Sequence, residues 1–250
     1  MKALVLEKKL DLKLRDIDLP TELGPDDVKI KMHTVGICGS DIHYYEHGKI
    51  GQWKVNEPMV LGHEGSGTVI DIGKNEKILK TGDRVCIEPQ VVSKKTKEYK
   101  LGIYNYDQKV KFWATPPIHG CLTPEVVFPG DMVFKIPDSL SYAEGAMVEP
   151  LAVGMQGVTK AQIKPGQIGL VMGCGPIGLV TALAALAGGC SKVYIADILR
   201  EKLKICEHYS GLVPVDLSKE NLSEKIMNDT NGWGVDRFFE CSGAVKAYES

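Results

Sequence analysis

Long hydrophobic runs are scarce in this sequence. The longest, Ile177 to Ala187, is too short to cross a lipid bilayer, and the amino terminus alternates apolar and charged residues instead of forming a signal peptide. The sequence also has no large excess of charge of one sign, because 30 basic and 32 acidic residues leave a net charge of -2. With no basic stripe or acidic tail, we expect a small-molecule partner, neither nucleic acid nor membrane, and a cytoplasmic location.

The sequence also lacks a regular cysteine pattern. Its seven cysteines are odd in number and irregularly spaced, so we expect free thiols in a reducing compartment instead of a disulfide framework. Most should be small buried apolar residues, in a chain whose apolar fraction of 44% suffices for a core. The cysteines are Cys38, Cys86, Cys121, Cys174, Cys190, Cys206 and Cys241.

Two regions with different patterns predict two domains, 1–154 and 155–250. In the first, short apolar runs such as 28–35, 67–72 and 84–87 are separated by Gly, Pro and Asp, which is typical of β-strands and turns. We expect an irregular, partly open β-barrel there, with loops that carry the function.

The second region alternates strand and helix patterns. Apolar runs at 168–173 and 192–197 read as buried strands, and the Leu- and Ala-rich segment 176–188 between them reads as a helix. A second helix over 198–209 and a strand over 235–243 continue the alternation. Such alternation predicts a doubly wound parallel sheet, so the fold class is α/β plus β.

A glycine-rich loop lies between the first strand and helix of this sheet. Gly173, Gly175, Pro176, Ile177 and Gly178 belong to a G-x-G-x-x-G pattern, whose context after a strand and before a helix indicates dinucleotide binding. The helix would direct its positive N-terminal end at the phosphates. A purely structural glycine turn is the alternative.

The coenzyme should be NAD. Asp197 ends the next strand, where a carboxylate accepts hydrogen bonds from the adenosine ribose and repels a 2′-phosphate. Lys202 and Arg200 lie close by in the sequence and weaken this preference for NAD over NADP.

Four residues of the first region are candidate zinc ligands. Cys38 lies among turn-forming residues, His63 and Glu64 are adjacent between glycines, and Glu149 follows an apolar run in which an unpaired carboxylate is costly. A catalytic zinc needs three protein ligands and an exchangeable fourth position. We assign Cys38, His63 and Glu64 as ligands, with Glu149 binding the water or entering the coordination at some step. Turn residues beside a buried thiol would produce the same pattern.

Five motifs occur in order along the chain: GICGSDIHYY, PMVLGHEGSGTV, GDRV, EGAMVEPLAVG and GCGPIG. Together they resemble the zinc-dependent medium-chain dehydrogenases, in particular the polyol (sorbitol and xylitol) branch, with the bacterial NAD-dependent xylitol dehydrogenases as the nearest likeness. The resemblance implies a GroES-like catalytic domain and a Rossmann coenzyme domain. It implies that Ser40 relays the substrate proton, that Tyr44 lines the polyol pocket, and that the enzyme is a dimer or tetramer.

Two features depart from that family. Many members hold a second, structural zinc with four cysteines, but residues 88–119 contain none, so we expect one catalytic zinc and no structural zinc. That lobe would then be held by packing of side chains such as Tyr104, Phe112 and Trp113. We count about four strands in the second region against six in a usual Rossmann sheet, so we expect an incomplete coenzyme domain.

The implied function is hydride transfer between a polyol secondary alcohol and NAD, with xylitol and D-xylulose or sorbitol as the substrate type. A zinc dehydrogenase of another substrate class, namely threonine, a sugar acid or a simple alcohol, is the nearest alternative. A zinc-free NADPH reductase relative is a more distant one.

Overall fold

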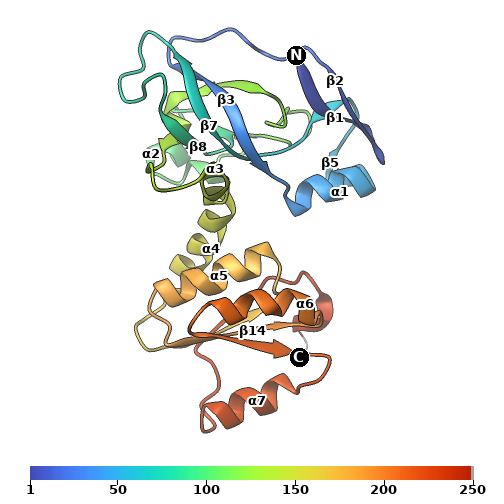
Figure 1. The fold of residues 1–250 in the computed structure, drawn as a ribbon, viewed down its shortest axis with the longest axis vertical. Coiled ribbons are helices and arrows are strands. Elements are labelled where there is room, and N and C mark those ends of the chain that lie inside the picture. The colour runs from blue at the N-terminus through green and yellow to red at the C-terminus, as the bar shows by residue number, and fades with distance from the viewer. Residues whose placement is uncertain (249–250) are drawn as a thin grey trace. The chain divides into compact units, whose positions relative to one another are not determined.

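Strands β3 (Asp27–Gly36) and β7 (Glu64–Ile72) form the centre of the larger sheet of the amino-terminal unit, in the computed structural model of residues 1–248 (Figure 1). They pair antiparallel from Val28 with Ile72 to Gly36 with Glu64. The sheet has five strands in the order β11-β3-β7-β8-β12. Its other members are β8 (Arg84–Ile87), β11 (Glu125–Pro129) and β12 (Val133–Lys135).

Smaller elements complete this unit. A three-stranded sheet has the order β2-β1-β6, and two short hairpins pair β4 with β5 and β9 with β10. These strands are β1 (Lys2–Lys8), β2 (Asp11–Asp16), β4 (Lys49–Ile50), β5 (Trp53–Lys54), β6 (Met59–Val60), β9 (Gln90–Val91) and β10 (Lys111–Phe112). The helices are α1 (Gly39–His47), α2 (Lys97–Lys100) and α3 (Tyr142–Ala146), with 3₁₀ turns η1 (Tyr104–Tyr106) and η2 (Gly130–Met132).

Burial on the central sheet follows its sequence pattern. Alternate residues of β3, Val28 and Ile30, are fully buried, and they pack with Val69 and Val85 of the neighbouring strands. Because side chains alternate across a strand, this pattern fixes which face of the sheet forms the core. The β-rich prediction for this region is confirmed.

The second unit contains a four-stranded parallel sheet in the order β15-β14-β13-β16. The strands are β13 (Ile168–Met172), β14 (Lys192–Asp197), β15 (Leu212–Asp216) and β16 (Arg237–Glu240). The helices are α4 (Val148–Ala161), α5 (Pro176–Ala187), α6 (Arg200–Leu203) and α7 (Leu222–Asp229), with 3₁₀ turns η3 (Lys204–His208) and η4 (Val245–Tyr248).

Helices cover both faces of this parallel sheet. Val171 and Ile195 pack in one cluster with residues of α5 and α6. Leu170 and Tyr194, which point to the opposite face, pack with Ile226 of α7. The predicted doubly wound arrangement is therefore confirmed.

Two predicted elements are shorter than expected. The helix predicted over 198–209 is a single α-helical turn, α6, followed by the 3₁₀ turn η3. Its start is delayed because the Asp197 carboxylate accepts the Leu199 N–H at 2.8 Å and forms a turn. The strand predicted over 235–243 ends at Glu240, whose carboxylate accepts the Ser242 N–H at 2.8 Å.

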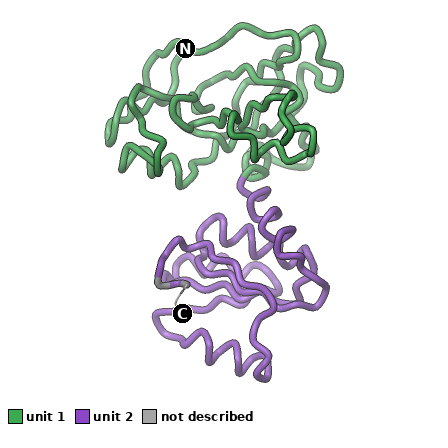
Figure 2. Tube along the Cα trace, turned by 180° about the vertical axis from the view of Figure 1, so that it is seen from behind, with its two compact units in different colours: residues 1–149 green, residues 150–250 purple. Residues whose placement is uncertain are grey.

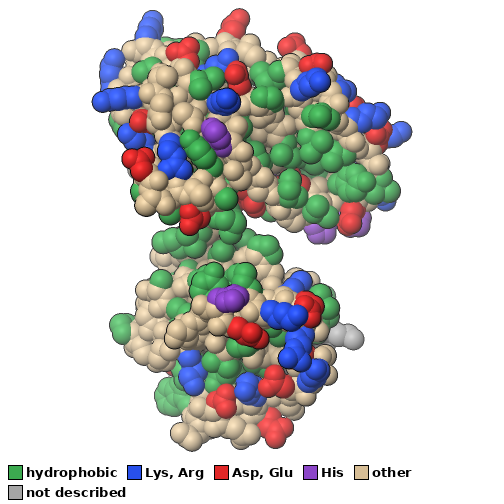
Figure 3. Space-filling model, in the orientation of Figure 1, with side chains coloured by type: hydrophobic (Ala, Val, Ile, Leu, Met, Phe, Trp, Pro, Cys, Tyr) green, Lys and Arg blue, Asp and Glu red, His purple; other side chains and the backbone are tan. Residues whose placement is uncertain are grey.

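The chain divides into units of residues Met1–Glu149 and Pro150–Ser250 (Figure 2). The sequence prediction put the division after residue 154, and helix α4 contains both positions. A helix carries no loop-like break in composition, so its sequence does not mark the division. Among residues 1–248, no helix is long and apolar enough to span a membrane. The face in Figure 3 carries acidic and basic side chains interspersed.

Candidate metal and coenzyme sites

The antiparallel pairing of β3 and β7 brings the candidate metal ligands together. Cys38 lies just after the end of β3, and His63 and Glu64 lie at the start of β7. Gly36 pairs with Glu64 in this register, and a Cβ at Gly36 would collide with the Glu64 carboxylate. The absence of a side chain at Gly36 therefore leaves room for Glu64 inside the protein.

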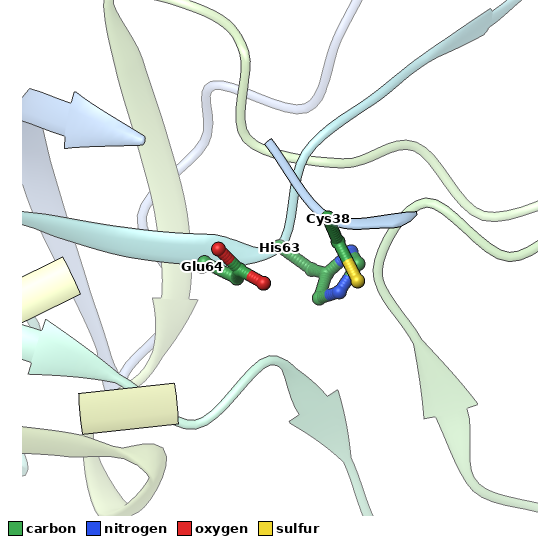
Figure 4. Close-up of side chains that lie close together, drawn as sticks. All are labelled: Cys38, His63 and Glu64. Carbon is green, nitrogen blue, oxygen red and sulfur yellow. The ribbon is translucent and has the colours of Figure 1, made fainter. Parts of the chain in front are cut away.

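Cys38, His63 and Glu64 form a compact group. One sulfur, one nitrogen and one oxygen atom, a single atom from each residue, all lie within 4.8 Å of one another. Figure 4 shows the thiol, the imidazole and the carboxylate around a common space. His63 is 5% exposed and Glu64 is 8% exposed, so the group lies below the surface. Among residues 1–248, this is the one such group of three or more possible ligands.

A neighbouring carboxylate connects the two ligand-bearing loops. Asp41, in the first turn of α1, is 2% exposed, and its Oδ2 accepts the Cys38 N–H at 3.0 Å. Its Oδ1 accepts the Gly62 N–H at 2.9 Å. One buried side chain, Asp41, thus fixes the backbone at Cys38 and at Gly62, next to His63.

Burial shifts the pKa of two side chains of this group, Cys38 and Glu64. Desolvation raises the pKa of the Cys38 thiol, although hydrogen bonds from the Ser40 side chain and backbone oppose the shift. Desolvation also raises the pKa of the Glu64 carboxyl, against the attraction of His63. A bound cation would stabilise the deprotonated forms of both groups.

The donor set fits a zinc ion. Thiolate, imidazole and carboxylate are all zinc ligands, and three protein ligands with an open position are typical of catalytic zinc. His63 Nδ1 is buried and has no hydrogen-bond partner among residues 1–248. A buried ring nitrogen without a partner is costly unless something outside the chain satisfies it. The chemistry of these residues therefore agrees with the predicted ligand set.

Glu149 lies outside the group of three. It occupies the first turn of α4, and desolvation raises the pKa of its carboxyl. The attraction of His63 and the repulsion of Glu64 both act on this carboxyl, so Glu149 lies within electrostatic reach of the group. Its predicted role, binding a water or entering the coordination, stays a prediction.

A cavity of about 760 Å³ opens beside the group formed by Cys38, His63 and Glu64. Ser40, Tyr44, His63 and Thr115 are among its lining residues. Tyr44 is 3% exposed; desolvation raises the pKa of its phenol, and a hydrogen bond with Thr115 opposes this. The two residues predicted to act on substrate, Ser40 and Tyr44, thus line the same cavity as one predicted ligand.

The cysteine-free lobe contributes a wall of this cavity. Phe112 packs edge-on against the His63 ring, with the two ring centroids 5.4 Å apart. Trp113 is buried and its ring centroid lies 4.3 Å from that of Phe128. Tyr104 donates to the Glu88 carboxylate at 3.2 Å. The contact of Trp113 with Phe128 connects the lobe to strand β11 of the sheet, and the hydrogen bond of Tyr104 joins two parts of the lobe.

The glycine-rich loop of the second unit has the backbone that its sequence predicts. Gly173 has a φ of 97°, which disfavours any residue with a side chain. A Cβ at Gly178 would overlap the Gly173 carbonyl oxygen, so this position admits only glycine. At Gly175 a Cβ would meet nothing within 4 Å, so the loop faces open space there. Pro176 and Ile177 begin helix α5, as expected.

Asp197 supports this loop directly. Its Oδ2 accepts the Cys174 N–H at 2.8 Å. Asp197, Lys202, Gly173 and Gly175 line one cavity of about 450 Å³ at the carboxyl ends of β13 and β14. The carboxyl ends of the strands are where open parallel sheets bind nucleotides.

Sequence reasoning did not identify Asp41. A signal was present, because Asp41 follows Cys38 by three residues, and that spacing suits an acidic side chain that caps the start of a helix. The bond to Gly62 had no such signal, because it joins residues 21 apart.

Comparisons with known proteins identify the family of both units. The alcohol dehydrogenase GroES-like domain matches residues 24–138, and the zinc-binding dehydrogenase domain matches residues 176–250. A D-xylulose reductase of Morganella morganii is 56% identical over 245 residues, which cover 98% of this chain and 72% of that protein. A sorbitol dehydrogenase of Rattus norvegicus is 40% identical over 250 residues, 99% of this chain and 70% of that protein.

A solved structure shows the same fold. The 2R,3R-butanediol dehydrogenase from Bacillus subtilis matches with a TM-score of 0.86 and 35% identity, over 98% of this chain and 72% of that one. The expected combination of a GroES-like domain and a Rossmann-type sheet is thereby confirmed. This chain belongs to the zinc-dependent medium-chain dehydrogenases, in the branch that includes the D-xylulose reductases and sorbitol dehydrogenases.

Proposed function

We propose that this protein transfers a hydride between the secondary alcohol carbon of a polyol, of the xylitol or sorbitol type, and NAD. The observation that carries the proposal is the group Cys38, His63 and Glu64, which lies beside a cavity lined by Ser40 and Tyr44. Relatives named for D-xylulose and sorbitol support the substrate class.

Cys38, His63 and Glu64 would hold one zinc ion. When bound, zinc supplies Lewis-acid chemistry, which makes an alcohol oxygen easier to deprotonate. Asp41 keeps the ligand-bearing backbone in place through its bonds to the Cys38 and Gly62 amides. Such supporting contacts orient ligands and raise the affinity for the metal.

Residues of the cavity would position the substrate and move its proton. The Ser40 hydroxyl lines the cavity and lies within hydrogen-bond reach of Cys38. It can relay the proton of the reacting hydroxyl, because Oγ accepts that proton while the Ser40 O–H passes its own hydrogen to a ribose hydroxyl of the coenzyme or to water. The Tyr44 hydroxyl, held by Thr115, offers a further hydrogen bond to a polyol. Phe112 covers His63 and excludes water from that side.

The second unit would hold the coenzyme, whose nicotinamide supplies the hydride chemistry. The pyrophosphate would lie over Gly175, where the loop is open, and at the N-terminus of α5. The Asp197 carboxylate would accept hydrogen bonds from the ribose hydroxyls of NAD, and its charge would repel the 2′-phosphate of NADP.

The test combines metal analysis with assays on one preparation of the purified protein. Zinc per chain is measured by mass spectrometry, and reduction of NAD and NADP is followed with xylitol, sorbitol, threonine, gluconate and 2-butanol. We expect zinc bound at one site and NAD reduction by the polyols, both lost in Cys38→Ser. Cys86→Ala serves as the control, because Cys86 is also a thiol of the first unit but lies buried in strand β8.

Each other outcome indicates a specific alternative. Zinc that stays bound in Cys38→Ser would contradict the ligand assignment. Turnover of threonine, gluconate or 2-butanol in preference to polyols would assign another substrate class within the family. A zinc-free protein that uses NADPH would belong with the zinc-free reductase relatives.

A further inference from the structure

Two histidines lie about one helical turn apart on α1, outside the group of Cys38 and its neighbours. The segment from His43 to His47 reads HYYEH, so the two imidazoles are four residues apart and Glu46 lies between them. All three residues belong to the 9-residue helix α1. Because residues three and four apart lie on the same face of a helix, this spacing puts two imidazoles and one carboxylate side by side. Two histidines four residues apart on a helix are a known spacing for zinc ligands.

The rings of these two histidines have a geometry that suits a shared ion. The ring centroids of His43 and His47 lie 5.4 Å apart, and the two planes are tilted by 52°. Two imidazoles that each bind one ion through a nitrogen at about 2.0 Å have centroids roughly 5 Å apart. The Oε2 atom of Glu46 lies 3.9 Å from Nε2 of His47. The helix therefore brings the donors together without any change in its backbone.

These side chains are also free to bind an ion from solvent. Asp41 and Tyr44 are the buried residues of α1, whereas His43, Glu46 and His47 are exposed. In the part of the chain that the structure describes, neither imidazole makes a hydrogen bond. The fold therefore makes no use of the ring nitrogens, which stay available as ligands.

We propose that His43 and His47 bind one divalent transition-metal ion, with Glu46 as a third ligand after a rotation of its exposed side chain. Imidazole nitrogen suits zinc, copper and nickel, whereas magnesium and calcium prefer oxygen ligands. Water fills the other positions, so this ion exchanges with solvent more readily than an ion held by the buried candidate catalytic group. The site is separate from that group and does not depend on the proposed function.

A bound ion would strengthen helix α1. It would connect the middle of the helix to its last turn, just before the chain leaves the helix at Gly48 with a φ of 71°. An ion that binds the folded helix and not the unfolded chain stabilises the fold by linkage. The same helix carries Asp41, which holds the backbone of Cys38 and Gly62. Occupancy of the surface site therefore supports the helix that positions the candidate catalytic group.

The test is a calorimetric titration of zinc-loaded protein with Zn²⁺, after dialysis has removed weakly held ions. We expect one further Zn²⁺ per chain. His43→Asn and His47→Asn should each lower its affinity about a hundredfold, because two donors on one scaffold bind far more tightly than either alone. Glu46→Gln should lower the affinity by a smaller factor, since both imidazoles remain. Saturating Zn²⁺ should raise the thermal unfolding midpoint of the wild-type protein but not that of His47→Asn.

Three variants serve as controls. His208→Asn removes an exposed histidine of the second unit and should bind Zn²⁺ as the wild-type protein does. Ile42→His combined with His47→Asn keeps two histidines on α1 but makes them adjacent, so they point in different directions. This double variant should bind as weakly as His47→Asn alone. Cys38→Ser should lose the tightly held zinc and keep the surface ion, which separates the failure of one site from the failure of the other.

Several results would overturn the inference. Zinc-loaded protein that takes up no further Zn²⁺ has no such site. Wild-type affinity in both His43→Asn and His47→Asn would show that the ion binds elsewhere. An equal loss in His208→Asn would indicate unspecific uptake by surface imidazoles, and undiminished binding in the double variant would show that the four-residue spacing is not what holds the ion.

Discussion

The Asp41 carboxylate accepts the backbone N–H of Gly62 at 2.9 Å and so joins the helix after Cys38 to the residue before His63. The same carboxylate accepts the Cys38 N–H, so one buried side chain sets the separation of two candidate ligands. A metal site formed from two loops requires such a connection, because either loop could otherwise shift by more than a metal–ligand bond tolerates.

Replacement of Asp41 should weaken metal binding more than it weakens the fold. We expect Asp41→Asn and Asp41→Ala to lower zinc affinity by about tenfold to a hundredfold, as is typical when a residue that orients metal ligands is lost. Competition with a chelator measures the affinity, and circular dichroism reports the fold. Asp18→Asn is the control at an exposed position. Unchanged zinc affinity in both Asp41 variants would show that the loops hold their positions without this carboxylate.

Gly175 and Gly178 should respond to alanine in different ways. Gly175→Ala should leave stability unchanged, since its Cβ meets nothing within 4 Å, but should weaken NAD binding about tenfold because the pyrophosphate must approach there. Gly178→Ala should lower the free energy of unfolding by about 2 kcal/mol or more, since its Cβ would overlap the Gly173 carbonyl. Urea unfolding and calorimetry separate the two effects. Equal stability losses in both variants would contradict the prediction.

The charge of Asp197 should govern the choice of coenzyme. Asp197→Asn removes the repulsion of a 2′-phosphate and keeps an oxygen for the loop, so the ratio of kcat/KM for NADP to that for NAD should rise about tenfold or more. Asp216→Asn is the control. Asp216 lies opposite Asp197 in the register of strands β14 and β15, but it does not line the coenzyme cavity. An unchanged ratio would mean that Lys202 or other residues decide the preference.

His119 should make stability depend on pH. Its Nδ1 accepts the Val60 N–H at 3.2 Å, and desolvation lowers its pKa from the usual value of 6.5. The imidazole of His119 therefore binds a proton more readily in the unfolded chain than in the folded one. The contribution of neutral His119 to the stability of the fold is fully present above about pH 6.5. It is lost as the pH falls through the lower pKa of the folded state.

Urea midpoints between about pH 7.5 and about pH 5.5 measure this dependence. His119→Asn keeps an acceptor for the Val60 N–H without a titrating ring, so it should flatten the pH dependence. The exposed control His47→Asn should leave the slope as in the wild-type protein. A His119→Asn slope equal to that of the wild type would assign the pH dependence to other groups.

Local sequence patterns were sufficient for much of the fold. The alternation of apolar residues located β3, β7 and β8, and the strands and helix around Gly173 followed from apolar runs and glycine spacing. These features depend on contacts between near neighbours in the chain, so they can be predicted from the sequence without a structure. The elements α6 and β16 were predicted at the right places but too long, because single carboxylates, Asp197 and Glu240, form turns at their ends.

The candidate ligands Cys38, His63 and Glu64 could also be named from their chemical types and motif spacing. Their approach to within 4.8 Å of one another follows from the β3–β7 register. The bond from Asp41 to Gly62 and the cavity that Ser40 and Tyr44 share with His63 depend on residues far apart in the chain. Only packing of the whole unit brings such groups together, because their contacts leave no periodic or spacing signal in the sequence.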